Sequence, residues 1–356
     1  MKHRKRKISG KKVGIITYHD GINYGAYFQA HSLFRLLEEV FKLDVEFINY
    51  KSLRHRLLEN LVFYHRFYDL QYLRNNINKI YKFKKAQSKF KVSRKVISKT
   101  WFRKIKYDYV FYGSDEIWNF KNPLVGFNPI YFGSFVDSEK VSYAPSFGSL
   151  SDSIKLSEKI VSELSTFKSI SVRDKNSQQI ILKNLRKKVP IVLDPTLLIG
   201  DELTPVLPKS KGYVLVYTTK IDDKILESIK MFAYKHNKQL ISVGYYYSWC
   251  DRSYVDVGPS EWLGFYENAD YVITSMFHGT IYAIKSKKNF VSIITEYRRN
   301  KLSSFLEEIG LKSRILTKPK DLDKILSRKP SYDKAFKEIS ARKKKSLEYI
   351  KQSLAK

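Results

Sequence analysis

The feature of this sequence that most constrains its fold is a repeated unit. Each unit has a short apolar, β-branched segment, then a polar turn, then a stretch with helical spacing of apolar residues. The first copy runs from 12–18 through the loop 19–25 to 26–40, and an alternating segment at 44–50 follows. A strand, loop, helix and second strand in this order are typical of the start of a Rossmann-like domain. The unit recurs, with strands predicted over 109–112, 140–148, 169–173 and 190–194.

The second half of the chain repeats the pattern after a stretch rich in proline and polar residues. Strands are predicted over 212–218, 239–243, 271–274 and 290–294, with helices over 222–235 and 261–268. Alternating strands and helices indicate a second parallel sheet. The predicted organisation is a basic arm at 1–12, a first Rossmann-like domain at 13–199 with a basic helical insertion at 51–106, a linker at 200–211, a second Rossmann-like domain at 212–325, and a basic C-terminal helix at 326–356.

Composition narrows the class of protein. Hydrophobic residues make up 43% of the 356 residues, which is enough for a sizeable core. The single cysteine, Cys250, excludes an intramolecular disulfide and a cysteine-based zinc site, and fits a reducing cytoplasm. Apolar runs stay shorter than the roughly 20 residues that a spanning helix needs. The apolar run 13–18 is too short for a signal peptide. These features predict a cytoplasmic protein.

The net charge of +31 is carried by three peripheral segments, 1–12, 51–106 and 311–356, while the rest of the chain is almost neutral. Enzymes that act on nucleic acid carry their basic residues around the active site, so no nucleic-acid partner is predicted. Peripheral basic helices that also carry aromatic residues suit an anionic membrane surface, at the inner face of the membrane, or a polyanionic substrate. The same charge is also explained by solubility alone.

Candidate site residues follow the predicted strands, because ligands of open α/β sheets bind beyond the carboxyl ends of the strands. After the strand 271–274, the turn contains Ser275, His278 and Gly279, and a helix begins near Thr280. Helix N-termini offer unpaired N–H groups, and a glycine lets backbone approach a ligand. The alternative is that the loop backbone satisfies His278 and that Gly279 only makes the turn.

The first predicted domain supplies further candidates at its strand ends. Asn23, Tyr24 and Gly25 stand where loop amides and a helix N-terminus could hold an anion or a sugar hydroxyl, or Asn23 is only the N-cap. Arg173 could hold a phosphate or carboxylate with two hydrogen bonds, or it could simply pair with Asp174 or another neighbour.

The turn after the strand 109–112 adds polar and aromatic candidates. Ser114, Asp115 and Glu116 are candidate substrate contacts, and Trp118 is a candidate platform for a sugar ring. The alternative is an acidic N-cap followed by a core tryptophan.

The sequence also lacks several motifs. It has no P-loop, H-E-x-x-H, G-x-S-x-G or G-x-G-x-x-G pattern. The one D-x-D, at 321–323, stands at the start of a tail helix, where it is better explained as a charged first turn. We therefore predict no metal and no cofactor.

Seven short motifs in a fixed order resemble the polysaccharide pyruvyl transferase family. They span roughly residues 13–295 and lie at 13–18, 23–29, 113–119, 142–148, 171–174, 194–196 and 273–280. Three residues differ from the usual family pattern, namely Met276 before Phe-His-Gly, Asp174 after the arginine, and Pro145.

The resemblance implies two Rossmann-like domains arranged as in GT-B glycosyltransferases, with the site in the cleft between them. It also implies transfer of pyruvate from phosphoenolpyruvate to a sugar of a cell-surface polysaccharide or its lipid-linked precursor, as a ketal. His278 and Arg173 match functional residues of the family. In this scheme, His278 has the intrinsic pKa for acid–base chemistry, and Asp115 is the candidate to accept the hydroxyl proton.

Two other hypotheses remain open at this point. A GT-B-type glycosyltransferase with a nucleotide-sugar donor would use the same fold, with His278 on a donor phosphate. A non-enzymatic module that binds anionic surfaces would explain the charge of +31 but not the polar loops that recur at strand ends.

Overall fold

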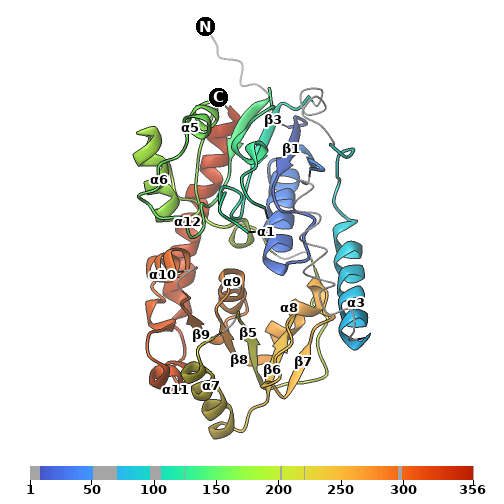
Figure 1. Cartoon of the computed structure of the whole chain (residues 1–356), viewed down its shortest axis with the longest axis vertical. Coiled ribbons are helices and arrows are strands. Elements are labelled where there is room, and N and C mark those ends of the chain that lie inside the picture. The colour runs from blue at the N-terminus through green and yellow to red at the C-terminus, as the bar shows by residue number, and fades with distance from the viewer. Residues whose placement is uncertain are drawn as a thin grey trace.

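The computed structural model describes residues 9–50, 70–96, 106–123, 125–200, 203–219, 221–295 and 299–355. They form two α/β lobes that lie one above the other in Figure 1, each built around a parallel sheet. The first sheet has the strand order β2-β1-β3-β4, and the second has the order β10-β9-β8-β5-β6-β7.

The first lobe contains the elements up to residue 200 and contacts the C-terminal helix. Its strands are short and their centres are fully buried, as expected of a parallel sheet covered on both faces. Its elements are β1 (Lys12–Ile16), α1 (Tyr24–Arg35), the π-helical turn Leu36–Val40, β2 (Asp44–Phe47), α3 (Leu70–Gln87), β3 (Tyr109–Tyr112), β4 (Glu139–Ser142), α5 (Glu158–Ser165) and α6 (Lys175–Leu185).

The second lobe begins after a segment at 203–212 that has no regular structure. Its elements are β5 (Tyr213–Tyr217), α7 (Asp223–Lys235), β6 (Leu240–Val243), β7 (Arg252–Tyr254), α8 (Pro259–Asn268), β8 (Ala269–Thr274), α9 (Phe277–Lys285), β9 (Asn289–Ile293), α10 (Arg299–Glu308), β10 (Ile315–Leu316), α11 (Leu322–Leu326) and α12 (Tyr332–Ala355).

Two segments that were predicted as strands of the first domain do not form regular strands in the structure. The segments 169–173 and 190–194 form only the isolated bridges Val141↔Ser169 and Val172↔Ile191. Serine hydroxyls take over part of the pairing, since Ser142 Oγ donates to Ser171 O and accepts from Ser171 N. Segment 169–173 still runs parallel beside β4, and segment 190–194 runs parallel beside 169–173, so Arg173 and Asp194 lie at the same edge of the sheet as the strand ends.

Helix α12 runs along both lobes in Figure 1. It begins at Tyr332 rather than at residue 326, because α11 ends at Leu326 and proline stands at position 330. Tyr332 Oη donates to Lys288 O in the second lobe, whereas Tyr349 Oη donates to Ser142 O of the first lobe at 2.8 Å. The C-terminal helix therefore ties the first lobe to the second.

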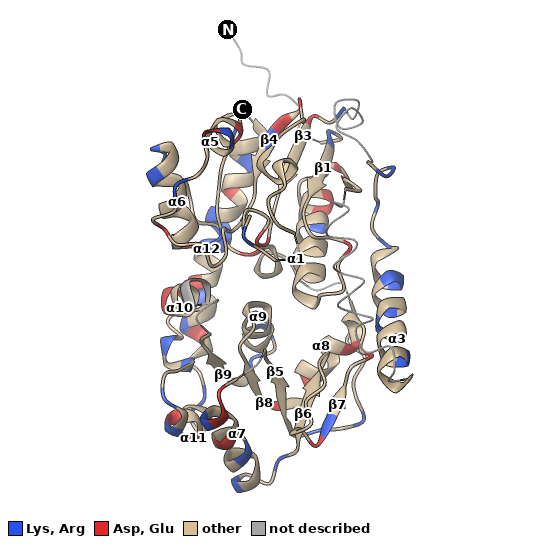
Figure 2. Ribbon diagram, in the orientation of Figure 1, with Lys and Arg blue, Asp and Glu red and all other residues tan. Residues whose placement is uncertain are grey.

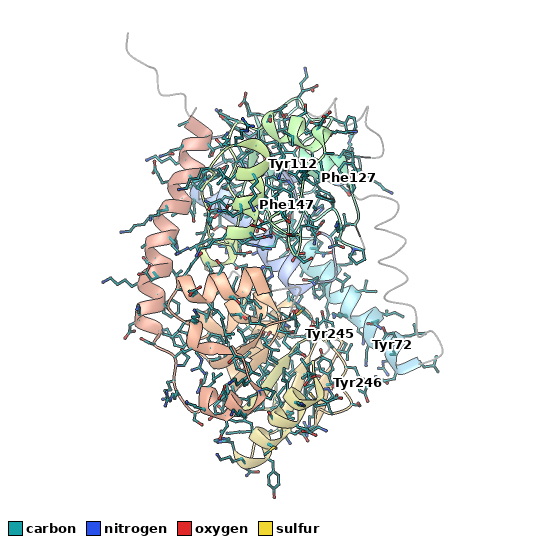
Figure 3. The ribbon with its side chains drawn as sticks, turned by 60° about the vertical axis from the view of Figure 1, so that its left-hand side comes forward. Tyr72, Tyr112, Phe127, Phe147, Tyr245 and Tyr246 are labelled. Atoms are coloured by element: carbon teal, nitrogen blue, oxygen red, sulfur yellow. The ribbon has the colours of Figure 1, made fainter. Side chains whose placement is uncertain are left out.

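Helix α3 is the described helix of the basic insertion, and it crosses between the lobes on the opposite side from α12 (Figure 1). Gln87 donates to Gly21 O of the first lobe, and Lys82 pairs with Glu261 of α8 at 2.7 Å. Lys79 of α3 lies over the ring of Tyr245 in the second lobe. Tyr112 and Phe147 lie inside the first lobe (Figure 3). The predicted helices within 51–69 and 97–105 and the basic arm at 1–8 lie outside the described residues.

Figure 2 shows lysine and arginine mainly on the outer helices and few charged residues on the central strands. Helix α3 carries Lys84 and Lys85 in its last turn. In the described part of the chain, no helix is both long and apolar enough to span a membrane.

Candidate active site between the two lobes

The centre of the candidate site is the carboxylate of Asp194. Asp194 caps the short 3-10 helix Pro195–Leu197, and its Oδ1 accepts from the Thr196 amide at 3.1 Å and from the Thr196 hydroxyl at 2.7 Å. The other oxygen, Oδ2, faces the gap between the lobes. It accepts from Arg173 Nη1 at 2.7 Å and lies 3.3 Å from Nε2 of His278.

Arg173 crosses the site from the first lobe. Its side chain is only 2% exposed, and its Nη2 lies 3.4 Å from Oδ1 of Asp115. The guanidinium carbon lies 4.8 Å from the ring centroid of Phe277, the first residue of α9, which is cation–π distance. Arg173 Nε is buried and has no hydrogen-bond partner among the described residues. The cation is thus held through its two terminal nitrogens, while its Nε has no acceptor among the described residues.

His278 approaches from the second lobe, in the first turn of α9. Its imidazole lies against the N-terminal turn of α1. The contact is so close that a Cβ placed on Gly25 would stand 2.2 Å from His278 Nδ1. Gly25 is thus required here by close approach of the two lobes. Nε2 of His278 therefore faces Asp194, and Nδ1 faces the first turn of α1.

The charges of this centre support one another. Burial raises the pKa of Asp194, but the neighbouring His278 and Arg173, with their hydrogen bonds, outweigh burial and hold that pKa well below its usual range. Burial lowers the pKa of Arg173, and Asp194 and Asp115 reverse this to a net increase. Asp194 is therefore a carboxylate at neutral pH.

Two helix N-termini meet at the site. In α1 the side chain of Asn23 accepts from Ala26 N at 3.0 Å, so Asn23 is the N-cap. In α9 no side chain caps the N-terminus, which is preceded by Met276. First-turn N–H groups of both helices, together with Arg173, favour an anion between the lobes.

Ser114 and Asp115 also reach the centre. Ser114 Oγ donates to Ala144 O at 3.1 Å and lies 3.5 Å from both Asp194 Oδ2 and Arg173 Nη1. Asp115 has a φ of 77°, a conformation that is strained for a residue other than glycine. Asp115 is therefore set by tertiary contacts at the end of β3, next to Arg173.

Other predicted contact residues serve packing instead, and the structure corrects these expectations. Trp118 is fully buried in the core of the first lobe, and its Nε1 donates to Tyr131 O at 2.9 Å, so no sugar ring can stack on it. Thr280 is buried and its hydroxyl bonds Ser292 at 2.8 Å. Gly279 approaches the ends of β8 and β5 rather than a ligand, since a Cβ there would lie 2.3 Å from Thr274 Oγ1.

Three further predicted residues are tied to the protein itself. Ser275 is buried and its Oγ accepts from Thr219 N, which joins the ends of β5 and β8. Tyr24 is buried at the lobe junction, where its hydroxyl donates to Val257 O at 2.7 Å. Glu116 is 9% exposed and lies 3.2 Å from the Asn119 amide.

Sequence reasoning did not include Asp194 among the candidate site residues, although it lies in the motif 194–196 and at the end of a predicted strand. The signal available was its place before a proline at a strand end. Its two partners lie 21 and 84 positions away in the chain, so only the fold could show their convergence. Among the described residues, no group of three or more His, Cys, Asp or Glu side chains is placed to hold a metal ion.

Comparison with solved structures gives the fold of the whole. The chain is 13% identical to a protein described as a UDP-N-acetylglucosamine 2-epimerase from Listeria monocytogenes, with a TM-score of 0.52 over 92% of this chain and 90% of that one. A second UDP-N-acetylglucosamine 2-epimerase structure gives 12% identity and a TM-score of 0.52, with 97% and 95% covered.

A Thermobaculum terrenum O-GlcNAc transferase is 9% identical, with a TM-score of 0.48, and this chain covers 65% of its length. The two epimerase structures with a TM-score of 0.52 show the fold alone, which is the GT-B arrangement of two Rossmann-like domains. A search among curated proteins gave no match.

A family model describes most of the chain. The model for polysaccharide pyruvyl transferases matches residues 23–297, a range that includes Arg173, Asp194 and His278. The match covers well over half of the sequence, so the chain belongs to the polysaccharide pyruvyl transferase family.

Proposed function

We propose that this transferase moves pyruvate from phosphoenolpyruvate to two hydroxyls of one sugar in a cell-surface glycan or its lipid-linked precursor, forming a cyclic ketal. The observation that carries the proposal is the centre of Arg173, Asp194 and His278 between two helix N-termini. A donor with a carboxylate and a phosphate needs this combination of fixed positive charge and a proton donor.

The chemistry starts with a proton. His278, protonated beside Asp194, gives a proton to the methylene carbon of the enol phosphate, and C2 becomes an oxocarbenium-like centre. One sugar hydroxyl forms a bond to C2, and a second hydroxyl forms another as the bond between C2 and the phosphate oxygen breaks. The products are the ketal and inorganic phosphate. Of the two hydroxyl protons, one replaces the proton used on the methylene and the other leaves on phosphate.

The remaining residues have roles that follow from their positions. Arg173 and the N-terminal turns of α1 and α9 stabilise the negative charge of the donor and of the departing phosphate. Asp115, held beside Arg173 at the end of β3, is positioned to accept a hydroxyl proton from the acceptor. The reaction as written needs no electron acceptor.

Phosphate release tests the proposal. Wild-type protein is incubated with phosphoenolpyruvate and a crude lipid-linked glycan fraction, and inorganic phosphate and glycan-bound pyruvate are measured together. We expect release that depends on both substrates and that falls by about 10²-fold or more in His278→Asn, because an amide cannot donate the proton. His236→Asn is the matched control. It also replaces a histidine that contacts an aspartate, but its partner is Asp323 and not Asp194. Release of nucleotide from a sugar-nucleotide pool instead would contradict the proposal.

A further inference from the structure

A small pocket with a cavity volume of about 20 Å³ adjoins the candidate active site. Both lobes and the C-terminal helix contribute to it. The residues that matter here are Arg173 and Asp194 from the first lobe, Phe277, Phe305 and Glu308 from the second, and Arg342 from α12. Nothing in the roles described above uses α10 or α12.

The pocket holds an unused hydrogen-bond donor. The two terminal nitrogens of Arg173 donate to Asp194 and Asp115, while its buried Nε has no partner among the described residues. A buried N–H without an acceptor is unfavourable, and at the wall of a pocket a bound ligand can supply the acceptor. The carboxylate Asp194 on the same wall is already saturated by Arg173, Thr196 and His278, so it does not neutralise this donor.

A second guanidinium, that of Arg342, lines the pocket and already binds a carboxylate. Arg342 Nη1 donates to Glu308 Oε2 at 2.5 Å. Glu308 Oε1 accepts from Ser304 Oγ at 2.9 Å and pairs with Lys175 Nζ at 3.4 Å. Glu308 is 13% exposed and Arg342 is 31% exposed. Arginine can bind a carboxylate with a planar pair of donors, and Arg342 already directs one of its terminal nitrogens at a carboxylate oxygen of Glu308.

The other walls suit a small ligand with little polar surface besides its anionic ends. The rings of Phe277 and Phe305 meet edge to face with their centroids 5.7 Å apart. Apolar walls exclude water and strengthen the attraction between the guanidinium groups and an anion.

We propose that this pocket binds the carboxylate of the three-carbon donor, through Arg342 and the free Nε of Arg173. The donor carboxylate replaces Glu308 as the partner of Arg342. Arg342 is then the residue that selects carboxylated enol phosphates. This inference rests on the proposed function and adds to it the part of the protein that recognises one end of the donor.

Titration with two enol phosphates, one with a carboxylate and one without, tests the carboxylate site separately from the transfer reaction. Phosphoenolpyruvate and vinyl phosphate, which is the same enol phosphate without the carboxylate, are titrated calorimetrically into wild type, Arg342→Met, Arg342→Lys and Glu308→Gln. Lys344→Met removes an exposed charge from the same helix and is the matched control. Thermal melting establishes that each variant is folded before titration.

We expect Arg342→Met to weaken phosphoenolpyruvate binding about tenfold or more while vinyl phosphate binding changes less than about twofold. Arg342→Lys keeps the charge but not the planar donor pair, so its affinity for phosphoenolpyruvate should lie between those of Arg342→Met and wild type. Glu308→Gln should tighten phosphoenolpyruvate binding, because the donor no longer competes with a resident carboxylate.

Equal weakening of both ligands in Arg342→Met, or no weakening of either, overturns the pocket assignment and leaves the proposed function intact. If folded wild-type protein binds neither ligand, the proposed function fails and the pocket assignment fails with it.

Discussion

At the scale of single residues, Asp194 joins the first lobe to the second. Its Oδ2 holds an arginine from the first lobe and a histidine from the second, and both contacts are almost fully removed from water. A buried ion pair adds little net stability compared with apolar residues, but loss of one partner leaves the other charge buried alone. The buried contacts of Asp194 with Arg173 and His278 are therefore better explained by a chemical role at the site than by a gain in folding stability.

Replacing Asp194 tests this description of the centre. Asp194→Asn should lower the free energy of unfolding at pH 7 by about 3–5 kcal/mol, because Arg173 keeps its buried charge without its main partner. The folded-state pKa of Asp194 is depressed, so its stabilising effect exists above the ordinary value of 3.8 and fades as pH falls below it. Urea unfolding at pH 7 and pH 3 should show the difference between the variant and wild type shrinking. Asp152→Asn, in an exposed pair with Lys183, should change stability by less than about 1 kcal/mol.

Gly25 tests the contact between the lobes. A methyl group on Gly25 would lie 2.2 Å from His278 Nδ1, so α1 or the imidazole must shift. Since a displacement of about 1 Å in an active site can cost about 10²-fold, we expect Gly25→Ala to lose most pyruvyl transfer. Gly200→Ala, where an added Cβ has no neighbour within 4 Å, is the control and should keep full activity. Normal activity in Gly25→Ala would show that His278 does not work from this position.

The candidate residues most accessible to sequence reasoning were those that follow strongly apolar strands. His278 and Asp115 follow the buried strands β8 and β3, and the structure places His278 beside Asp194 and Asp115 beside Arg173. Trp118 could not be assigned in this way, because an aromatic residue after a strand turn looks the same in sequence whether it faces a ligand or the core. Burial decided the question, and burial is a property of the whole fold.

At the scale of elements, the strands were predictable because their apolar runs match buried parallel strands. The segments 169–173 and 190–194 have the same apolar character, yet serine hydroxyls replace part of their backbone pairing. Side-chain hydrogen bonding of this kind depends on a neighbour far away in sequence, so a local pattern could not distinguish it from a ladder.

Helix α3 brings a buried lysine to the junction of the lobes. Lys79 donates to Gly244 O at 2.9 Å and lies over the rings of Tyr24 and Tyr245, at 5.1 and 5.5 Å from their centroids. Burial lowers the pKa of Lys79 from 10.5 to about 8. The insertion thus contributes a packing contact next to the predicted substrate residue Tyr24, rather than only surface charge.

The pH dependence of stability tests the burial of Lys79. Between pH 8 and 10.5 the unfolded chain binds a proton here that the folded protein does not, so stability should rise with pH in that window. The rise specific to Lys79 is roughly 3 kcal/mol at about 1.4 kcal/mol per pKa unit. Lys79→Met should remove this component, measured as the difference from wild type in urea unfolding at pH 7.5 and 10.5. Lys85→Met, which removes an exposed lysine from the same helix, controls for the loss of charge. A constant difference across that range would contradict the burial.

At the scale of the whole molecule, the lobes are joined on two sides, by α3 and by α12, and the site lies between them (Figure 1). The first lobe supplies the fixed cation and the candidate base, and the second supplies the candidate acid. A complete centre therefore exists only when the two lobes are held together.

The most direct test of the central claim is mass spectrometry of the glycan after reaction with phosphoenolpyruvate in D₂O. Protonation of the methylene carbon by His278, whose proton exchanges with solvent, predicts a glycan that gains one pyruvyl group as a ketal with one deuterium in its methyl group. One inorganic phosphate should appear for each group transferred. A product that keeps the enol double bond, or a glycan that gains no pyruvyl group, would contradict the claim that this centre transfers pyruvate as a ketal.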